Sequence, residues 1–271
     1  MQPMTEASPA RKYAPRGTRV REVPAVTRSI AILRLLGRTQ QPMGVKAIAD
    51  ELGLVPSTCL HILRVLVEEE LVNLEPQTRR YSLGSGMISL ARSVLEGGGF
   101  TQLVQPALEQ IAHQHGISVM GVEITPRQTV LVLALAHSEQ PFRLHTDVGS
   151  QFSTWVSATG RLMAAHSGET WVQLRKRFKQ IPWDQAPTFD TWKKQVELAR
   201  ERGWSVDRDN FMSGVTVLAV PVFATVGRMT HTLVAVGLSG HFSATVMQSV
   251  VAQMSQAARE VERHLQALHR S

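Results

Sequence analysis

The sequence predicts a two-domain α+β protein, and three observations support this prediction. Two short helical patterns joined by a tight turn lie in the N-terminal part, between Val45 and Leu66. Three consecutive glycines at positions 97–99 then interrupt the helical pattern. After them, apolar β-type runs alternate with helical patterns towards the C-terminus. The 271 residues suffice for two domains of the usual size.

The helix pair has one apolar face on each of its two helices. Gly53 stands between them at the position of a C-cap, which favours a residue that tolerates a positive φ. Pro56 can open the second helix, because a first-turn residue has no intrahelical partner for its N–H. The apolar residues at the i, i+3, i+4, i+7 spacing are Val45, Ile48, Ala49 and Leu52, then Cys59, Ile62, Leu63 and Leu66. We therefore predict a helix-turn-helix.

The opposite face of the second helix is polar and carries few acids. It presents Ser57, Thr58, His61 and Arg64. Such side chains suit hydrogen bonds to base edges and phosphates. The alternative, a solvated face of an ordinary helix, would show more Glu and Lys than this. Because a turn-linked helix pair is a known DNA-docking unit, we predict that this face reads double-stranded DNA.

Two short strands are predicted directly after the helix pair, at residues 71–74 and 80–83. The intervening residues form a turn, so the hairpin would be a wing. This wing would bear Arg79 and Arg80, which suit phosphate contacts, and Arg28 is expected to do the same. Residues 23–84 are thus predicted to form a winged helix-turn-helix domain.

The chain has a net charge of +7, which favours an anionic partner. Eight basic residues but one acid, Glu22, lie between Arg11 and Arg38, so the excess stands next to the predicted DNA-reading domain. A single cysteine excludes an internal disulfide and fits a reducing compartment. We see neither an apolar run of about 18 residues nor a signal peptide. We therefore expect a cytoplasmic protein without membrane contact.

Residues 1–22 are rich in Pro, Ala, Arg and small polar residues, which cannot bury a core. We predict a flexible basic arm, either a tail without function or one that contacts phosphates or the minor groove through Arg19 and Arg21. A first helix would follow, with Ile30, Leu33 and Leu36 as its apolar face, and then a turn at residues 38–44.

A linker helix is predicted over residues 85–99, and its apolar residues run from Met87 to Leu95. The glycines at its end set the domain boundary, so the second domain would comprise residues 100–271. The strands predicted there lie at residues 117–124, 129–137, 142–146, 204–207, 215–223 and 230–238, and the helices at residues 100–116, 156–168, 169–179, 188–203 and 243–268. We expect a central, mainly antiparallel sheet.

Motifs in both halves of the chain resemble the IclR-type (isocitrate-lyase-regulator type) family of bacterial transcription factors, over about residues 23–268. Those in the first half are TRSIAILRLL, VKAIADELGLVPST, the EEELVNLEP run and RRYSLGSGMISLA. Those in the second are VGSQFSTWVSATGRLMAA, RGWSVDRDNFMSGVTVLAVPV and VAVGLSG. The resemblance implies a GAF-like effector-binding and oligomerisation domain, and a homodimer or homotetramer on palindromic operators. The implied ligand is a small organic acid or an aromatic catabolite.

The resemblance also implies positions for an effector site. The backbone N–H groups of Ala158 and Thr159 would lie at a helix start, which is a ready anion site. Asp207 and Ser239 match polar pocket positions, and Leu144 and Phe152 match lining positions. Three departures favour a larger or more apolar ligand than a short keto acid: Val217 in place of a polar residue or thiol, Gly237 in place of a second hydroxyl, and Phe152-Ser153 in place of an aliphatic residue and proline.

Other classes of protein are weaker alternatives. We find no nucleophile elbow, phosphate loop, dinucleotide fingerprint or zinc-protease motif, so we expect no enzyme and no cofactor. The ten histidines show no ligand spacing, and we expect no metal site. A purely architectural DNA-binding protein would leave the pocket signature unexplained. Repressor and activator both stay open, and repression is the family's commoner mode.

Overall fold

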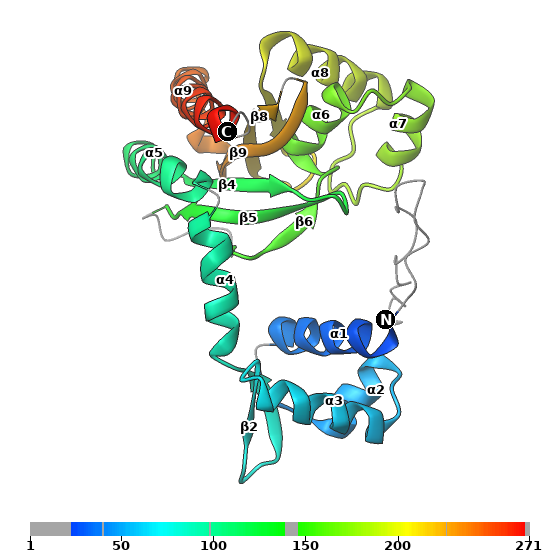
Figure 1. The fold of residues 1–271 in the computed structure, drawn as a ribbon. Helices are drawn as coiled ribbons and strands as arrows, with labels where there is room; N and C mark the ends of the chain where they lie inside the picture. The colour runs from blue at the N-terminus through cyan, green and yellow to red at the C-terminus, as the bar shows by residue number, and fades with distance from the viewer. Residues whose placement is uncertain (1–22, 40, 98, 139–145, 226, 269–271) are drawn as a thin grey trace. The chain divides into compact units, whose positions relative to one another are not determined.

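The computed structural model describes residues 23–39, 41–97, 99–138, 146–225 and 227–268 (Figure 1). The predicted arm with Arg19 and the expected lining residue Leu144 lie outside this part of the chain. The chain divides into two compact units, and the boundary between them lies between Val94 and Leu95.

Three helices form the body of the first unit: α1 (Pro24–Thr39), α2 (Val45–Leu52) and α3 (Pro56–Glu68). Their buried side chains form one core, which includes Ile48, Cys59, Leu63 and Leu66 as predicted. Gly53 has φ +62° and ends α2, and Pro56 is the first residue of α3. The predicted apolar face of α1 is wrong for Ile30, which is 42% exposed. The helix instead buries Ile32, Leu35 and Leu36 at the i, i+3, i+4 spacing.

A three-stranded antiparallel sheet completes this unit, in the order β1-β3-β2. Its strands are β1 (Met43–Gly44), β2 (Val72–Glu75) and β3 (Arg80–Leu83). The wing hairpin is confirmed. The turn predicted at residues 38–44 is wrong for its last two residues. Met43 and Gly44 form a short strand, in which Met43 pairs with Tyr81 and Gly44 with Arg80. Helix α4 (Gly86–Gly97) follows, where the linker helix was predicted.

The second unit is built on a six-stranded sheet in the order β6-β5-β4-β9-β8-β7, with every pair antiparallel (Figure 1). The strands are β4 (Ser118–Ile124), β5 (Thr129–Ala136), β6 (Gln151–Ser153), β7 (Ser205–Arg208), β8 (Val215–Thr225) and β9 (Arg228–Leu238). The edge strand β6 was not predicted. The expected strand at residues 142–146 lies almost wholly outside the described residues.

Helices cover both faces of this sheet, which explains its nearly continuous apolar strands. Leu233 and Ala235 of β9 face a core formed with α5 (Phe100–His115) and α9 (Ala244–Leu268). Val234 and Val236 alternate with them and face α6 (Ser157–His166) and α8 (Phe189–Arg202). Two further helices are α7 (Trp171–Phe178) and the 3-10 helix η1 (Ser239–His241). Within the described residues, every helix is too short or too polar to span a lipid bilayer.

Candidate functional site

The polar face of α3 lies on the surface of the first unit. Ser57, His61 and Arg64 are exposed, and Thr58 is half-buried beside them. The helix can present this face because Cys59, Leu63 and Leu66 anchor its other side in the core. Val65 is 57% exposed next to the polar group, a residue that sequence reasoning passed over. A methyl-bearing side chain among hydrogen-bonding ones suits contact with thymine methyl groups.

The expected phosphate ligands stand at three places in the same unit. Arg28 is exposed on α1. Arg79 is exposed at the end of the wing turn, in a left-handed conformation with φ +55°. The neighbouring Arg80 donates from Nη1 to the carbonyl oxygen of Pro42 at 3.3 Å. Arg80 therefore also ties the base of the wing to the segment before α2.

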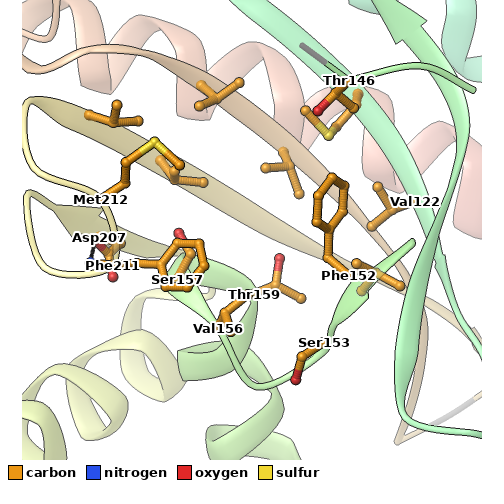
Figure 2. A pocket seen from close by; sticks show the side chains of 16 residues that line it. Val122, Thr146, Phe152, Ser153, Val156, Ser157, Thr159, Asp207, Phe211 and Met212 are labelled. Carbon is orange, nitrogen blue, oxygen red and sulfur yellow. Dashed lines mark hydrogen bonds between the residues drawn. The ribbon is translucent and has the colours of Figure 1, made fainter. Parts of the chain in front are cut away.

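The second unit contains a cavity of about 240 Å³ on the sheet face that α6 covers (Figure 2). Its wall on the sheet side is formed by apolar side chains of four strands: Met120, Val122, Val130, Val215, Val217, Val234 and Val236. Its polar lining residues are Thr146, Ser153, Ser157, Thr159 and Asp207. Among the described lining residues there is no lysine, arginine or histidine. The cavity suits a largely apolar molecule with a hydrogen-bonding group.

The start of α6 forms the polar end of this cavity. Ser157 has φ +56°, which is unusual for a residue with a side chain. The residue is 9% exposed, and no described group hydrogen-bonds to its Oγ. No side chain caps the helix, so its first N–H groups lack that partner. Gly160 packs so closely that a Cβ there would lie 2.0 Å from the Trp155 carbonyl oxygen.

Arg161 holds the start of α6 in position through its hydrogen bonds. Its fully buried guanidinium donates to the Ser157 carbonyl oxygen at 3.0 Å and to Asp207 Oδ2 at 2.5 Å. It also donates to Gln195 Oε1 and Asn210 Oδ1, both at 2.9 Å. Burial lowers the pKa of Arg161, and the carboxylate of Asp207 opposes that shift. One cation therefore joins α6, β7, α8 and the turn after β7.

Asp207 lines the cavity, but both of its oxygens have protein partners. Oδ2 accepts from Arg161, and Oδ1 accepts from the backbone N–H groups of Asn210 and Phe211 at 3.2 and 3.1 Å. The second set of bonds fixes the turn that carries Phe211, another lining residue. The carboxylate of Asp207 is therefore held in place by the protein and forms part of the cavity wall.

The structure brings four of the expected effector residues to one cavity: Phe152, Thr159, Asp207 and Val217. Ala158 lies between the lining residues Ser157 and Thr159, but its side chain is in the core, so only its backbone N–H is suited to a ligand. Ser239 is not among the lining residues. Its Oγ lies 2.6 Å from Asp209 Oδ1 and 2.9 Å from Thr216 Oγ1.

The interpretation of Gly237 as a missing pocket hydroxyl is wrong. A Cβ at this position would lie 3.1 Å from Ile117 and 3.2 Å from Phe242, on the sheet face covered by α5 and α9. Strand alternation explains the result, because the preceding Val236 points into the cavity. Sequence reasoning also missed Ser157, Arg161 and Phe211. A serine at the second position of the predicted helix was the available signal for the first, whereas the other two depend on partners distant in sequence.

Two domain-family models match most of the chain. The IclR helix-turn-helix domain matches residues 25–76, and the C-terminal domain of the bacterial transcriptional regulator IclR matches residues 93–263. The glycerol operon regulatory protein of Streptomyces griseus is 27% identical over 222 residues, covering 81% of this chain and 85% of that protein. The HTH-type transcriptional repressor AllR of Escherichia coli is 22% identical over 232 residues, 84% of each.

Solved structures share the fold. An IclR transcriptional regulator from Alicyclobacillus acidocaldarius aligns with a TM-score of 0.79 at 24% identity, over 91% of this chain and 100% of that one. An IclR homologue from Microbacterium hydrocarbonoxydans, complexed with 4-hydroxybenzoate, aligns with a TM-score of 0.73 at 17% identity, over 90% and 99% of the two chains.

Proposed function

Because this chain belongs to the IclR family of bacterial transcriptional regulators, we propose that it is a repressor whose binding to operator DNA is controlled by a small aromatic or alicyclic carboxylic acid. It is a DNA-binding regulator and not an enzyme. The proposed control by a carboxylic acid rests on the apolar cavity, which has the uncapped start of α6 at one end.

The chemistry of the cavity supports an effector with an apolar body and one acceptor group. Valine and methionine side chains receive the body. The Ser157 hydroxyl, which has no described partner, and the first N–H groups of α6 receive the acceptor. Asp207 is neutralised by Arg161, so it does not repel a carboxylate as a bare acid would. The 4-hydroxybenzoate held by the Microbacterium homologue belongs to this chemical class.

DNA reading is assigned to the first unit. Ser57, Thr58, His61 and Arg64 would contact base edges in the major groove. Arg28, Arg79 and Arg80 would contact phosphates, and the segment with Arg19 would add salt-dependent affinity. A homodimer or homotetramer in the cytoplasm would place two DNA-binding domains on half-sites that lie about one helical turn, or a multiple of it, apart.

The effector acts if it binds one conformation of the protein more tightly than another. Helix α4 lies at the junction of the two units, so it is the segment through which we expect this preference to reach α3. Repression is proposed because the relative AllR is named a repressor.

The test combines ligand binding with DNA binding on the full chain. Benzoate, 4-hydroxybenzoate and cyclohexanecarboxylate are screened by thermal shift, followed through tryptophan fluorescence. All five tryptophans lie beyond residue 94, so this signal reports the second unit alone. Each stabilising acid is then titrated into complexes with promoter DNA and with scrambled DNA at the same salt concentration.

We expect an acid that raises the melting temperature and weakens binding to promoter DNA but not to scrambled DNA. Stabilisation without any change in promoter affinity would contradict effector control. Specific promoter binding that no acid alters would contradict the acid class, and tighter promoter binding in the presence of the acid would contradict repression relieved by a ligand.

A further inference from the structure

A second cavity of about 310 Å³ lies beside the first. Four residues line both cavities: Phe152, Ser153, Val156 and Phe211. These four residues therefore form the wall that the two cavities share.

The two aromatic residues of this wall lie in parts of the fold that few neighbouring contacts hold in place. Phe152 belongs to the edge strand β6, which has three residues and pairs with β5 on one side. Its side chain is 42% exposed. Phe211 lies in the turn between β7 and β8, where it is half-buried. A change of the Phe152 rotamer requires no rearrangement of a close-packed core, so the wall can open to join the two cavities.

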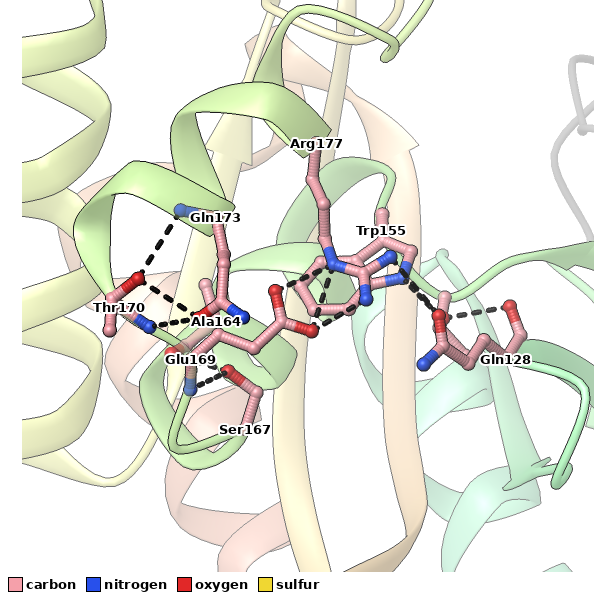
Figure 3. A network of polar contacts seen from close by, with 9 residues as sticks. Gln128, Trp155, Ala164, Ser167, Glu169, Thr170, Gln173 and Arg177 are labelled. Carbon is pink, nitrogen blue, oxygen red and sulfur yellow. Dashed lines mark hydrogen bonds and ion pairs between the residues drawn. The ribbon is translucent and has the colours of Figure 1, made fainter. Parts of the chain in front are cut away.

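One side of the second cavity carries a network of polar contacts around Arg177 (Figure 3). The Arg177 guanidinium carbon lies 4.0 Å from the centre of the Trp155 ring, and Glu169 holds the same guanidinium at 2.5–3.0 Å. Gln128 Oε1 accepts from both Arg177 Nη1 and Trp155 Nε1. These contacts hold a charged pair and an aromatic ring in place before any ligand arrives. The exposed Gln180 adds an amide to the lining of this cavity.

Most lining residues of the second cavity are apolar, as in the first, but the second also offers the polar side chains of Arg177 and Gln180. The first is smaller than most ligand sites, which measure about 300–1,000 Å³, and its sheet wall is apolar. The second adds volume together with the amide of Gln180 and the Arg177–Glu169 pair. The start of α6 lies at their junction, because Val156 lines both cavities and Ser157 lines the first.

We infer that the two cavities form one bipartite site for an aromatic acyl compound with a polar arm beyond its carbonyl group. The ring occupies the first cavity, the carbonyl oxygen accepts from the start of α6, and the arm passes Phe152 to reach Gln180 in the second cavity. This inference rests on the proposed function and names its ligand class more narrowly.

Calorimetry on the full chain tests it with benzoate and hippurate. Both carry a phenyl ring with a carbonyl oxygen, and hippurate adds a carboxymethyl amide arm. Gln180→Trp fills the second cavity from its exposed rim. Lys179→Trp is the matched control, because Lys179 is also exposed and lines neither cavity.

We expect the unsubstituted protein to bind hippurate about tenfold more tightly than benzoate, as one additional hydrogen-bonded group would give. Gln180→Trp should abolish this gain and leave benzoate binding unchanged, whereas Lys179→Trp should change neither. Benzoate binding with no gain for hippurate, or a gain that survives Gln180→Trp, overturns the bipartite site and leaves the proposed function standing. Equal weakening of both ligands by Gln180→Trp also overturns it. If no acid binds the unsubstituted protein, both inferences fail.

Discussion

Arg161 Nη1 and Asp207 Oδ2 lie 2.5 Å apart, in an ion pair whose two side chains are each 1% exposed. Asp207 in turn orders the turn that carries Phe211, and Arg161 holds the carbonyl oxygen of Ser157. The pair therefore determines the shape of the cavity from two sides.

Arg161→Met should destabilise the second unit by about 3–5 kcal/mol, because it leaves the Asp207 carboxylate buried without its partner. The free energy of unfolding is measured with urea and tryptophan fluorescence. The double variant Arg161→Met, Asp207→Asn removes the uncompensated charge and should recover part of the loss. If the double variant is as unstable as the sum of both single variants, the two groups do not act as a pair.

Ser157→Ala should weaken the binding of an acid effector by about 1 kcal/mol while leaving the ligand-free protein about as stable as before, because the hydroxyl has no described partner to lose. Ser157→Gly should additionally stabilise the ligand-free protein by about 1 kcal/mol, since glycine adopts φ +56° without strain. Calorimetry and urea unfolding check the two effects separately. Loss of stability on Ser157→Ala would show that the hydroxyl has a structural partner.

Arg64→Ala and Arg79→Ala should weaken DNA binding in different ways. Removal of Arg64 should cost about 1–3 kcal/mol at particular base pairs and so reduce discrimination. Removal of Arg79 should weaken binding to all sequences about equally and lower the salt slope by about 1. Fluorescence anisotropy at several salt concentrations, with operator and substituted duplexes, separates the two. An Arg64 variant that binds every duplex equally more weakly would make this residue a phosphate ligand.

His231 should make the second unit sensitive to acid. Its ring stacks on Phe100 at 4.2 Å, and burial lowers its pKa from 6.5 to about 4. The unfolded chain therefore takes up a proton as the pH falls below about 6.5, while the folded chain does not until about pH 4. Stability should fall across this window, by roughly 3 kcal/mol at most.

His231→Phe keeps the stacked ring without the titration, so it should flatten the dependence of the unfolding free energy on pH. His113→Gln, at an exposed position of α5, is the control for the removal of a histidine elsewhere in the second unit. An equally steep dependence in the His231→Phe variant would assign the acid sensitivity to other groups.

Much of the fold could be predicted from local sequence patterns. The faces of α2 and α3 follow from apolar spacing, and Gly53 and Pro56 mark the ends of the turn between them. The helix containing Ile30 has aliphatic residues on more than one side, so spacing alone selected the wrong face. Strand β1 has two residues and is defined by its pairing with Tyr81 and Arg80, which no local pattern contains.

The site was less accessible from sequence. A helix start next to Ser157 was predictable, but the left-handed conformation of this residue and its unpartnered hydroxyl were not. Arg161 and Asp207 are 46 residues apart, and only the folded chain shows that each neutralises the other. Gly237 was misassigned because the side of a strand on which a residue lies depends on register, and one position separates the two faces.

The two sides of the cavity differ in how freely they can diverge during evolution. The residues around Arg161 are linked by hydrogen bonds, so replacing one of them leaves others unsatisfied. Val215, Val217, Val234 and Val236 contribute methyl groups from strands whose pairing uses the backbone alone. Exchanges among aliphatic or small polar residues there would reshape the cavity and leave its support intact. Single codon changes on these two adjacent strands could thus change which ligand the cavity accepts.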